Sequence, residues 1–209
     1  MKNKGALLVI SGPSGAGKSS IIKELLKQIP NAVFSISTTT RNKREDEVDG
    51  VNYHFTDEKS FQKEIEEGAF LEWANVHGCF YGTSLKQIVK FLDEEKLVIL
   101  DIDVQGYMLL KKRLKRYITS VFLTTKNIEE LKARLLLRQS DSKTEVKKRL
   151  KNAIAEMNYI NRYKYLVIND DFKTAFAQML NIAHSALNKR SLIDSDKFIQ
   201  TWKRAKKAK

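Results

Sequence analysis

One glycine-rich segment constrains the fold of this chain more than any other feature of its sequence. Residues 12–19 read Gly-Pro-Ser-Gly-Ala-Gly-Lys-Ser and fit the pattern G-x-x-x-x-G-K-[ST]. The segment follows Gly5–Ile10, whose continuous apolar run predicts a buried strand, and precedes Ser19–Ile29, whose apolar residues recur at helical spacing. Glycines let the backbone curl so that several N–H groups point at phosphate oxygens, and the helix adds the positive end of its dipole. A strand, such a loop and a helix in this order predict a phosphate-binding loop (P-loop).

The loop also carries the side chains that a nucleoside triphosphate and its metal ion need. Lys18 is expected to reach the β- and γ-phosphates, and Ser19 to place its hydroxyl on a magnesium ion. The residues predicted to hold ATP here are Gly12, Pro13, Ser14, Gly15, Ala16, Gly17, Lys18, Ser19 and Ser20. The apolar run 98–100 ends on Asp101, and Asp103 follows, so either carboxylate could influence the metal through a water molecule. The alternative is an aspartate that only caps the end of a strand.

The remaining apolar runs predict the fold class. Runs at 33–36, 96–101, 118–123 and 165–169 predict strands, and residues 128–137 and 146–163 predict helices between them. Strands that alternate with helices favour an α/β class with a mainly parallel sheet, here the three-layer fold of P-loop NTPases. Two segments fit this alternation less well, because 37–83 is polar, aromatic and turn-rich and 126–151 is strongly basic. We interpret both as lobes inserted into the α/β core.

The net charge of the 209-residue chain is +13, with a pI of about 9.7. Such a balance suggests a polyanionic partner: nucleic acid, an anionic membrane surface or a phosphorylated small molecule. Part of the excess lies in Trp202–Lys209, which we interpret as a solvated, frayed end. The apolar runs are too short to span a bilayer, no signal peptide is evident, and the single Cys79 excludes an intramolecular disulfide. A cytoplasmic location is therefore expected.

A second group of motifs follows the P-loop. Ser37-Thr-Thr-Thr-Arg41 and Arg44 place hydroxyls beside two guanidinium groups, which suit a phosphate monoester. The motifs that come after them, in order, are Glu47, Gly50, Tyr53, Glu72-Trp-Ala, Tyr81-Gly-Thr83, Leu100-Asp-Ile-Asp-Val-Gln-Gly106 and Ile168-Asn-Asp-Asp171. In this order and spacing, the chain resembles the guanylate kinase family from about residue 5 to about residue 188.

The resemblance implies transfer of a phosphoryl group from ATP to GMP, giving ADP and GDP, with dGMP as a further acceptor. The residues that it implies for GMP binding are Ser37, Arg41, Arg44, Tyr53, Glu72, Tyr81, Thr83 and Asp101. Arg41, Arg44 and Tyr53 would hold the phosphate, which Tyr81 supports. Ser37 and Thr83 would address the O6 and N2 edge of guanine. Asp101 would lie near the guanine amino group or the metal, and the resemblance leaves that choice open.

The chemistry of Glu72 agrees with a guanine site. A carboxylate that faces N1–H and N2–H₂ is satisfied by guanine, whereas adenine offers an acceptor at N1 and no amine at position 2. A buried polar group left unpaired costs about 1–3 kcal/mol, which is roughly 10-fold to 100-fold in selectivity.

The basic segment is implied to act on the transferring group. Arg134, Arg138 and Arg149 would close over it and, with Lys18 and Arg41, form the catalytic set, while Asn169 would lie near the adenine of ATP. Phosphoryl transfer is catalysed mostly by positioning and by charge stabilisation, with ATP and Mg²⁺ as the required small molecules. No strong general base is needed, and His54, His77 and His184 are expected to be surface or half-buried residues.

The expected organisation is a core at about 1–36, 84–125 and 152–188, a GMP-binding lobe at 37–83, a lid at 126–151 and a basic extension at 189–209. The sequence departs from many relatives at Lys43, where proline is common, and at Gln139, where glycine is common. Neither change removes a group implied to contact phosphate.

Three other functions compete with this interpretation. A kinase acting on a ribose bisphosphate would keep the P-loop and arginines but would not need Glu72. A non-catalytic scaffold module resembling guanylate kinase would typically lack a working P-loop, which is intact here. A nucleic-acid binder would use the positive charge, but no recognised nucleic-acid module is present, and no specific nucleic acid or membrane partner is expected. The oligomeric state stays open.

Overall fold

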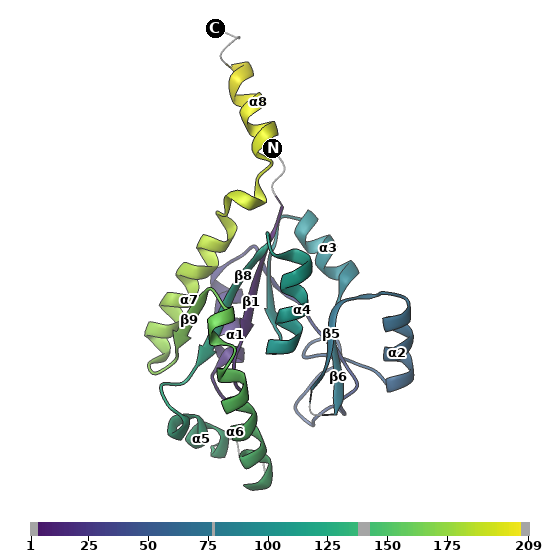
Figure 1. The fold of residues 1–209 in the computed structure, drawn as a ribbon, viewed down its shortest axis with the longest axis vertical. Coiled ribbons are helices and arrows are strands. Elements are labelled where there is room, and N and C mark those ends of the chain that lie inside the picture. Colours follow the sequence, from purple (N-terminus) through teal and green to yellow (C-terminus); the bar gives the residue numbers. More distant parts are fainter. Residues whose placement is uncertain (1–3, 77, 138–142, 206–209) are drawn as a thin grey trace.

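The computed structural model describes residues 4–76, 78–137 and 143–205 (Figure 1). Its centre is a five-stranded sheet in the order β2-β7-β1-β8-β9, in which every neighbouring pair is parallel. The strands are β1 (Ala6–Ser11), β2 (Ala32–Phe34), β7 (Leu97–Asp101), β8 (Ile118–Thr124) and β9 (Tyr165–Ile168). The predicted α/β class with a mainly parallel central sheet is confirmed.

Helices cover both faces of this sheet, which explains why its central strand is apolar at consecutive positions. Alternate residues of β1 point to opposite faces. Leu8 and Ile10 pack in one core beneath α1 (Lys18–Gln28) and α7 (Phe172–Leu187), and Leu7 and Val9 pack in a second core. That second core lies beneath α3 (Leu85–Asp93) and α4 (Val104–Leu114). The parallel strands therefore point their carboxyl ends, and the loop after β1, toward one edge of the molecule.

A second, four-stranded sheet lies beside the first, in the order β4-β3-β6-β5. Its elements are β3 (Thr38–Thr39), β4 (His54–Phe55), α2 (Glu58–Glu66), β5 (Phe70–Val76) and β6 (Cys79–Ser84). Stacked rings of Phe61, Phe70 and Phe80 form its interior. This small sheet falls within the turn-rich, aromatic segment that interrupts the strand–helix alternation.

The basic segment forms two packed helices, α5 (Ile128–Leu136) and α6 (Lys143–Met157), with Leu131, Leu135 and Val146 buried between them. The predicted helix 146–163 was wrong at both ends, since α6 starts earlier and stops at Met157. A short 3-10 turn, η1 (Ile160–Arg162), then redirects the chain into β9. The tyrosines and asparagines that follow Met157 favour a helix less than the alanines and charged residues before them.

The C-terminal segment differs from the sequence-based expectation. After η2 (Arg190–Leu192), helix α8 (Ser195–Ala205) extends away from the body of the molecule (Figure 1). Residues 202–205, expected to be frayed, are helical. The Asp194 carboxylate accepts from the backbone N–H of Lys197 at 3.1 Å, which caps the helix start. Residues 206–209 of that expectation lie outside the described residues.

Candidate active site

The P-loop lies between the carboxyl end of β1 and the start of α1, as the motif predicts. Gly12 adopts a φ of 142°, and a Cβ at this position would lie 1.9 Å from the Leu123 carbonyl oxygen. Gly17 caps α1 with a φ of 98°, and a Cβ there would lie 2.3 Å from the side-chain nitrogen of Asn169. Both glycines are therefore required by backbone conformation and by the close approach of neighbouring groups.

Lys18 and Asp101 meet at the mouth of this loop. The Lys18 Nζ donates to the carbonyl oxygens of Gly12 at 2.6 Å and Pro13 at 3.2 Å, and it lies 3.9 Å from an Asp101 carboxylate oxygen. Because β7 pairs with β1 in parallel, Asp101 stands opposite Ile10, directly beside the strand that enters the loop. Burial raises the pKa of Asp101, and the Lys18 charge opposes that shift.

Two arginines, from α5 and α6, and an asparagine that follows β9 contact the loop and support it. Arg149 donates to the Ser14 hydroxyl at 2.8 Å, and Arg134 donates to the Asn169 carbonyl at 2.6 Å and pairs with Glu130. The Asn169 side chain donates to the Ala16 carbonyl at 2.8 Å. The structure thus brings Arg134 and Arg149 to the P-loop, while Arg138 lies outside the described residues.

A cavity of about 370 Å³ opens beside the P-loop. It is lined by Gly15, Gly17, Ser20, Arg134, Asn169, Asp170 and Phe172. The Asn169 side chain is buried and donates its hydrogen bond to the Ala16 carbonyl of the loop. This residue therefore positions the loop as well as bordering the cavity. A group attached to a phosphate chain that the P-loop holds would lie in this cavity.

Four side chains of the small sheet and its loops form a cluster around one guanidinium group. The Arg41 guanidinium pairs with Glu47 at 2.6 Å and lies 5.4 Å from the Tyr53 ring centroid. Burial lowers the pKa of Arg41, but Glu47 and Tyr81 raise it, and the pKa is raised on balance. The Tyr53 and Tyr81 rings are 5.9 Å apart. Burial raises the pKa of Tyr53 to about 12, with the Asp101 charge adding to it. This cluster therefore faces the acidic end of β7.

The side chain of Arg44 is exposed, whereas its backbone N–H donates to Glu47 at 2.9 Å. Glu47 therefore holds the Arg41 guanidinium and the Arg44 backbone together. The sequence analysis named Glu47 among the motifs that follow Arg41 and Arg44 but assigned it no role. Its spacing of six residues from Arg41 and three from Arg44 is the signal that could have suggested one.

A buried carboxylate lies deeper in the same lobe. Glu72 is 6% exposed and accepts from the Thr83 hydroxyl at 2.5 Å, across paired strands β5 and β6. Burial raises the pKa of Glu72 to about 7; the Thr83 bond lowers it, and the charge of Asp103 raises it further. A Cβ at Gly106 would lie 2.4 Å from the second carboxylate oxygen, so the glycine leaves room for Glu72. Ser37 is half-buried, and its carbonyl accepts from the His54 backbone N–H at 2.9 Å.

Asp101 and Asp103 have different surroundings, although only one residue separates them: Asp101 is the last residue of β7, and Asp103 is the N-cap residue of α4. Asp103 caps α4 by accepting from the Gly106 N–H at 2.8 Å, and its charge is felt by Glu72, whereas Asp101 is the carboxylate beside Lys18. A third acid, Glu156 of α6, is half-buried: burial raises its pKa, Lys18 lowers it, and Asp103 and Asp101 raise it further. No signal in the sequence singled out Glu156, because it reaches the site from a distant helix.

The donor groups fit a magnesium ion carried on ATP phosphates. Among the described residues, no group of three or more acidic, histidine or cysteine side chains could hold a metal by itself. Ser19 is exposed in the first turn of α1, and Asp101 lies nearby beside Lys18. Magnesium keeps several waters and needs only one or two protein oxygens when phosphates supply the rest.

Comparisons with known proteins identify the family of this chain. The chain matches the guanylate kinase family over residues 4–186. It is 48% identical over 200 residues to a guanylate kinase of Helicobacter hepaticus, covering 96% of this chain and 100% of that one. A guanylate kinase of Wolinella succinogenes is 46% identical over 202 residues, covering 97% and 94%. The crystal structure of guanylate kinase from Anaplasma phagocytophilum superposes with a TM-score of 0.77 at 29% identity, covering 91% and 90%. The chain belongs to the guanylate kinase family.

Proposed function

We propose that the chain phosphorylates GMP at the expense of ATP, giving GDP and ADP, with dGMP as a further acceptor. The observation that carries this function is a P-loop, with Lys18 in place, beside a lobe that buries the Glu72–Thr83 pair. A phosphate donor site would then lie beside a base-reading acceptor site, which is what transfer between two nucleotides needs.

On the donor side, the backbone N–H groups of the P-loop and Lys18 bind the phosphates of ATP. Lys18 would exchange its present carbonyl partners for phosphate oxygens, which its flexible stem allows. Ser19, with Asp101 through water, would hold Mg²⁺, which neutralises charge on the phosphates. The contact between Asp101 and Lys18 supports this assignment over a guanine contact.

On the acceptor side, Arg41, Tyr53 and Tyr81 receive the GMP phosphate, and Arg44 turns its exposed side chain toward it. Glu47 would hold the Arg41 guanidinium in place before GMP arrives, which reduces the entropy lost on binding.

The base is read by Glu72, by Thr83 and by Asp103, with Ser37 at the same edge. The proximity of Asp103 to Glu72 supports Asp103, rather than Asp101, as the carboxylate near the guanine amino group. Two acceptors facing N1–H and N2–H₂ match guanine and leave adenine without partners.

In the transfer step, an oxygen of the GMP phosphate forms a bond to the γ-phosphorus of ATP while the bond from that phosphorus to the β,γ-bridging oxygen breaks. Lys18, Arg41, Arg134 and Arg149 stabilise the charge that spreads over the transferring group, and we assign Arg138 to the same set. Because the attacking oxygen is already anionic, no base has to remove a proton.

We also propose that residues 37–83 form a GMP-binding lobe and 126–151 a lid on a core of 1–36, 84–125 and 152–188, with 189–209 as an extension. Helix α6 crosses the proposed boundary at 151, so the lid would move with the helix that carries Glu156. Closure would exclude water from the transferring group.

Among the helices that the structure describes, none has the length and apolar character of a membrane span. We propose a cytoplasmic location for the enzyme.

The direct test mixes the purified chain with ATP and Mg²⁺ and offers GMP, AMP, CMP, UMP and ribose 1,5-bisphosphate separately, following ADP with time. We expect ADP with GMP and little with the others. Turnover with the ribose bisphosphate alone would overturn the guanine pocket, and folded protein without turnover on any acceptor would leave a binding module.

A further inference from the structure

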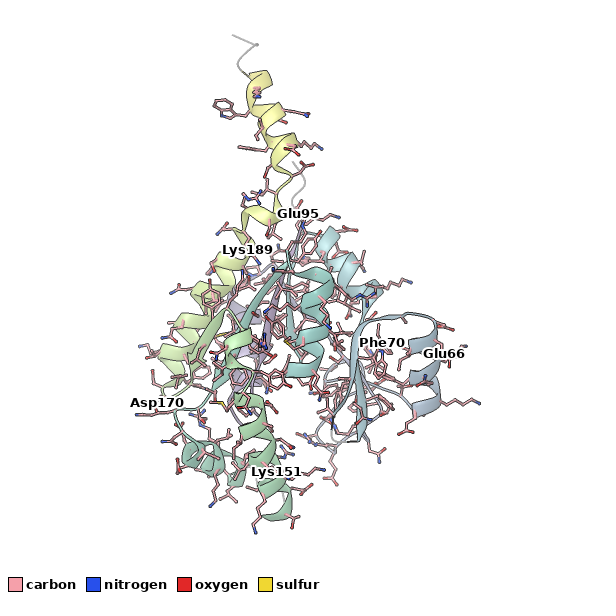
Figure 2. The ribbon with its side chains drawn as sticks, viewed as in Figure 1. Glu66, Phe70, Glu95, Lys151, Asp170 and Lys189 are labelled. Carbon is pink, nitrogen blue, oxygen red and sulfur yellow. The ribbon has the colours of Figure 1, made fainter. Side chains whose placement is uncertain are left out.

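A second cavity lies on the edge of the central sheet opposite the P-loop. It has a volume of about 610 Å³, and its lining includes Ile118, the first residue of β8, and Lys164, which precedes β9. The P-loop follows the carboxyl end of β1, and β1 and β8 are parallel, so the amino end of β8 faces away from the nucleotide site. Figure 2 shows Lys189, which also lines this cavity, far from Asp170 of the P-loop edge.

The lining of this cavity is basic. Of its nine residues, the five charged ones are Lys111, Lys115, Arg116, Lys164 and Lys189, and none of the nine described lining residues is acidic. They come from separate places in the chain: the end of α4, the turn before β9 and the segment after α7. The fold therefore gathers charges that the sequence keeps apart.

Several of these cations are held in position by neutral backbone groups. Lys111 donates to the Arg162 carbonyl at 2.7 Å and lies 5.3 Å from the Tyr107 ring centroid. Lys189 donates to the Ile118 carbonyl, and Arg116 donates to the Ser191 carbonyl through Nε at 3.3 Å and Nη2 at 3.0 Å. A carbonyl orients an ammonium or guanidinium group without cancelling its charge.

The negative ends of nearby helix dipoles balance only part of the positive charge of these five residues. The carboxyl ends of α4 and α7 point toward the cavity region, and each carries about half a negative charge, so roughly one of the five positive charges is balanced. The mutual repulsion that remains is visible at Lys189, where burial and then the Lys164 charge lower the pKa of the amino group to about 8. An anion bound between them would relieve this repulsion.

We propose that this cavity is a second anion-binding site, separate from the nucleotide site, that takes a small molecule carrying several phosphate groups. Its volume lies in the range of small-ligand sites, about 300–1,000 Å³, and its hollow form suits a compact anion rather than an extended polymer. Lys115 and Lys164, both exposed, stand at the surface to receive phosphates, while Lys111 and Lys189 are half-buried. This site does not depend on the function proposed above.

The test is a calorimetric titration with inorganic triphosphate at fixed ionic strength. Because the P-loop also binds phosphate chains, the protein is first saturated with GMP and a non-hydrolysable ATP analogue. We expect one additional site per chain. The double variant Lys115→Gln, Lys164→Gln should weaken binding at this site at least tenfold while leaving GMP phosphorylation unchanged.

The matched control is Lys86→Gln, Lys112→Gln, which removes the same charge from exposed positions outside the cavity. It should leave triphosphate affinity nearly unchanged. Equal losses in both double variants would overturn the site and reduce the effect to overall charge, as would the absence of any additional binding. Tighter binding of a single-stranded RNA oligonucleotide, lost in the cavity variant, would replace the small anion with a nucleic-acid surface.

Discussion

The donor and acceptor sides of the active site are built in different ways. On the donor side, Lys18 is held by backbone carbonyls, and the loop owes its shape to Gly12 and Gly17. On the acceptor side, side chains hold one another: Arg41 with Glu47, and Thr83 with Glu72. A site made of backbone tolerates almost no change in conformation, whereas a site made of paired side chains can exchange partners when the ligand arrives.

The two sides of the active site also differ in the ionisable groups that they bury. Glu72 is buried beside another acid, and its pKa is raised to about 7, so the acceptor side changes charge near neutral pH. On the donor side the acid is Asp101, and there the Lys18 charge opposes the rise that burial causes in the pKa of the carboxyl. The following predictions test this contrast, from the largest expected effect to the smallest.

Lys18→Ala should lower kcat about 100-fold to 1,000-fold, because one positioned charge on the transferring group is lost in the transition state. Lys23→Ala, on the exposed face of the same helix, is the control and should be nearly neutral. Steady-state rates with saturating GMP measure both. Retention of more than a tenth of the wild-type kcat would remove Lys18 from the catalytic set.

Gly12→Ala should destabilise the fold by about 3 kcal/mol or more, since it combines positive φ with a clash against backbone. Gly68→Ala is a matched control, because its φ is 67° but nothing lies within 4 Å of the added Cβ. The control should cost about 1 kcal/mol. Urea unfolding compares the two, and equal costs would contradict the claim that backbone contact dictates the donor loop.

Glu72→Ala should reduce the preference for GMP over AMP about 10-fold to 100-fold, because the guanine N1–H and N2–H₂ lose their acceptor. The ratio of kcat/KM for the two acceptors is the measurement. Glu66→Ala, at the exposed end of α2, controls for loss of a nearby charge. Undiminished preference in the Glu72 variant would refute its role in reading the base.

The pH dependence of GMP binding should reveal the same carboxylate. The folded pKa of Glu72 is raised to about 7, so the group protonates as pH falls through 7 and can no longer accept both guanine donors. We expect the Kd for GMP to rise up to about tenfold between pH 8 and pH 6. The GMP phosphate titrates near pH 6 as well, so Glu72→Gln serves as the reference. Only the part of the change in Kd with pH that the wild type shows and this variant lacks is assigned to Glu72.

The same raised pKa affects stability with the opposite sense. The native state binds more protons than the unfolded state between about pH 4.5 and pH 7, so the free energy of unfolding contributed by Glu72 falls as pH rises through that window. Glu72→Gln should flatten this part of the stability profile. A profile unchanged by the substitution would show that Glu72 titrates normally.

Glu47→Gln should raise the KM for GMP about fivefold with a smaller change in kcat, because Arg41 loses a charged hydrogen bond worth about 1 kcal/mol. Glu45→Gln is the exposed neighbour and the control. A fall in kcat at unchanged KM would instead place Arg41 mainly on the transferring group.

Much of the fold could be predicted from local patterns. The strands at 97–101, 118–124 and 165–168 and the helix after the P-loop fall where apolar periodicity predicts them. The end of α6 and the helical residues 202–205 were missed, because helix ends depend on competing turns and on caps such as Asp194. Family resemblance, rather than periodicity, supplied the roles of residues in the small sheet.

The sequence by itself determined the P-loop, the α/β class and the order of the acceptor motifs. A P-loop depends on backbone conformations that eight consecutive residues dictate, so it can be predicted without knowing which distant segments pack against it. Only the tertiary structure separated Asp101, beside Lys18, from Asp103, beside Glu72, and brought Glu156 to the same site. It alone gathered five basic residues at the opposite edge of the sheet. These features depend on which distant elements pack together, and that packing sets burial, charge and proximity at once.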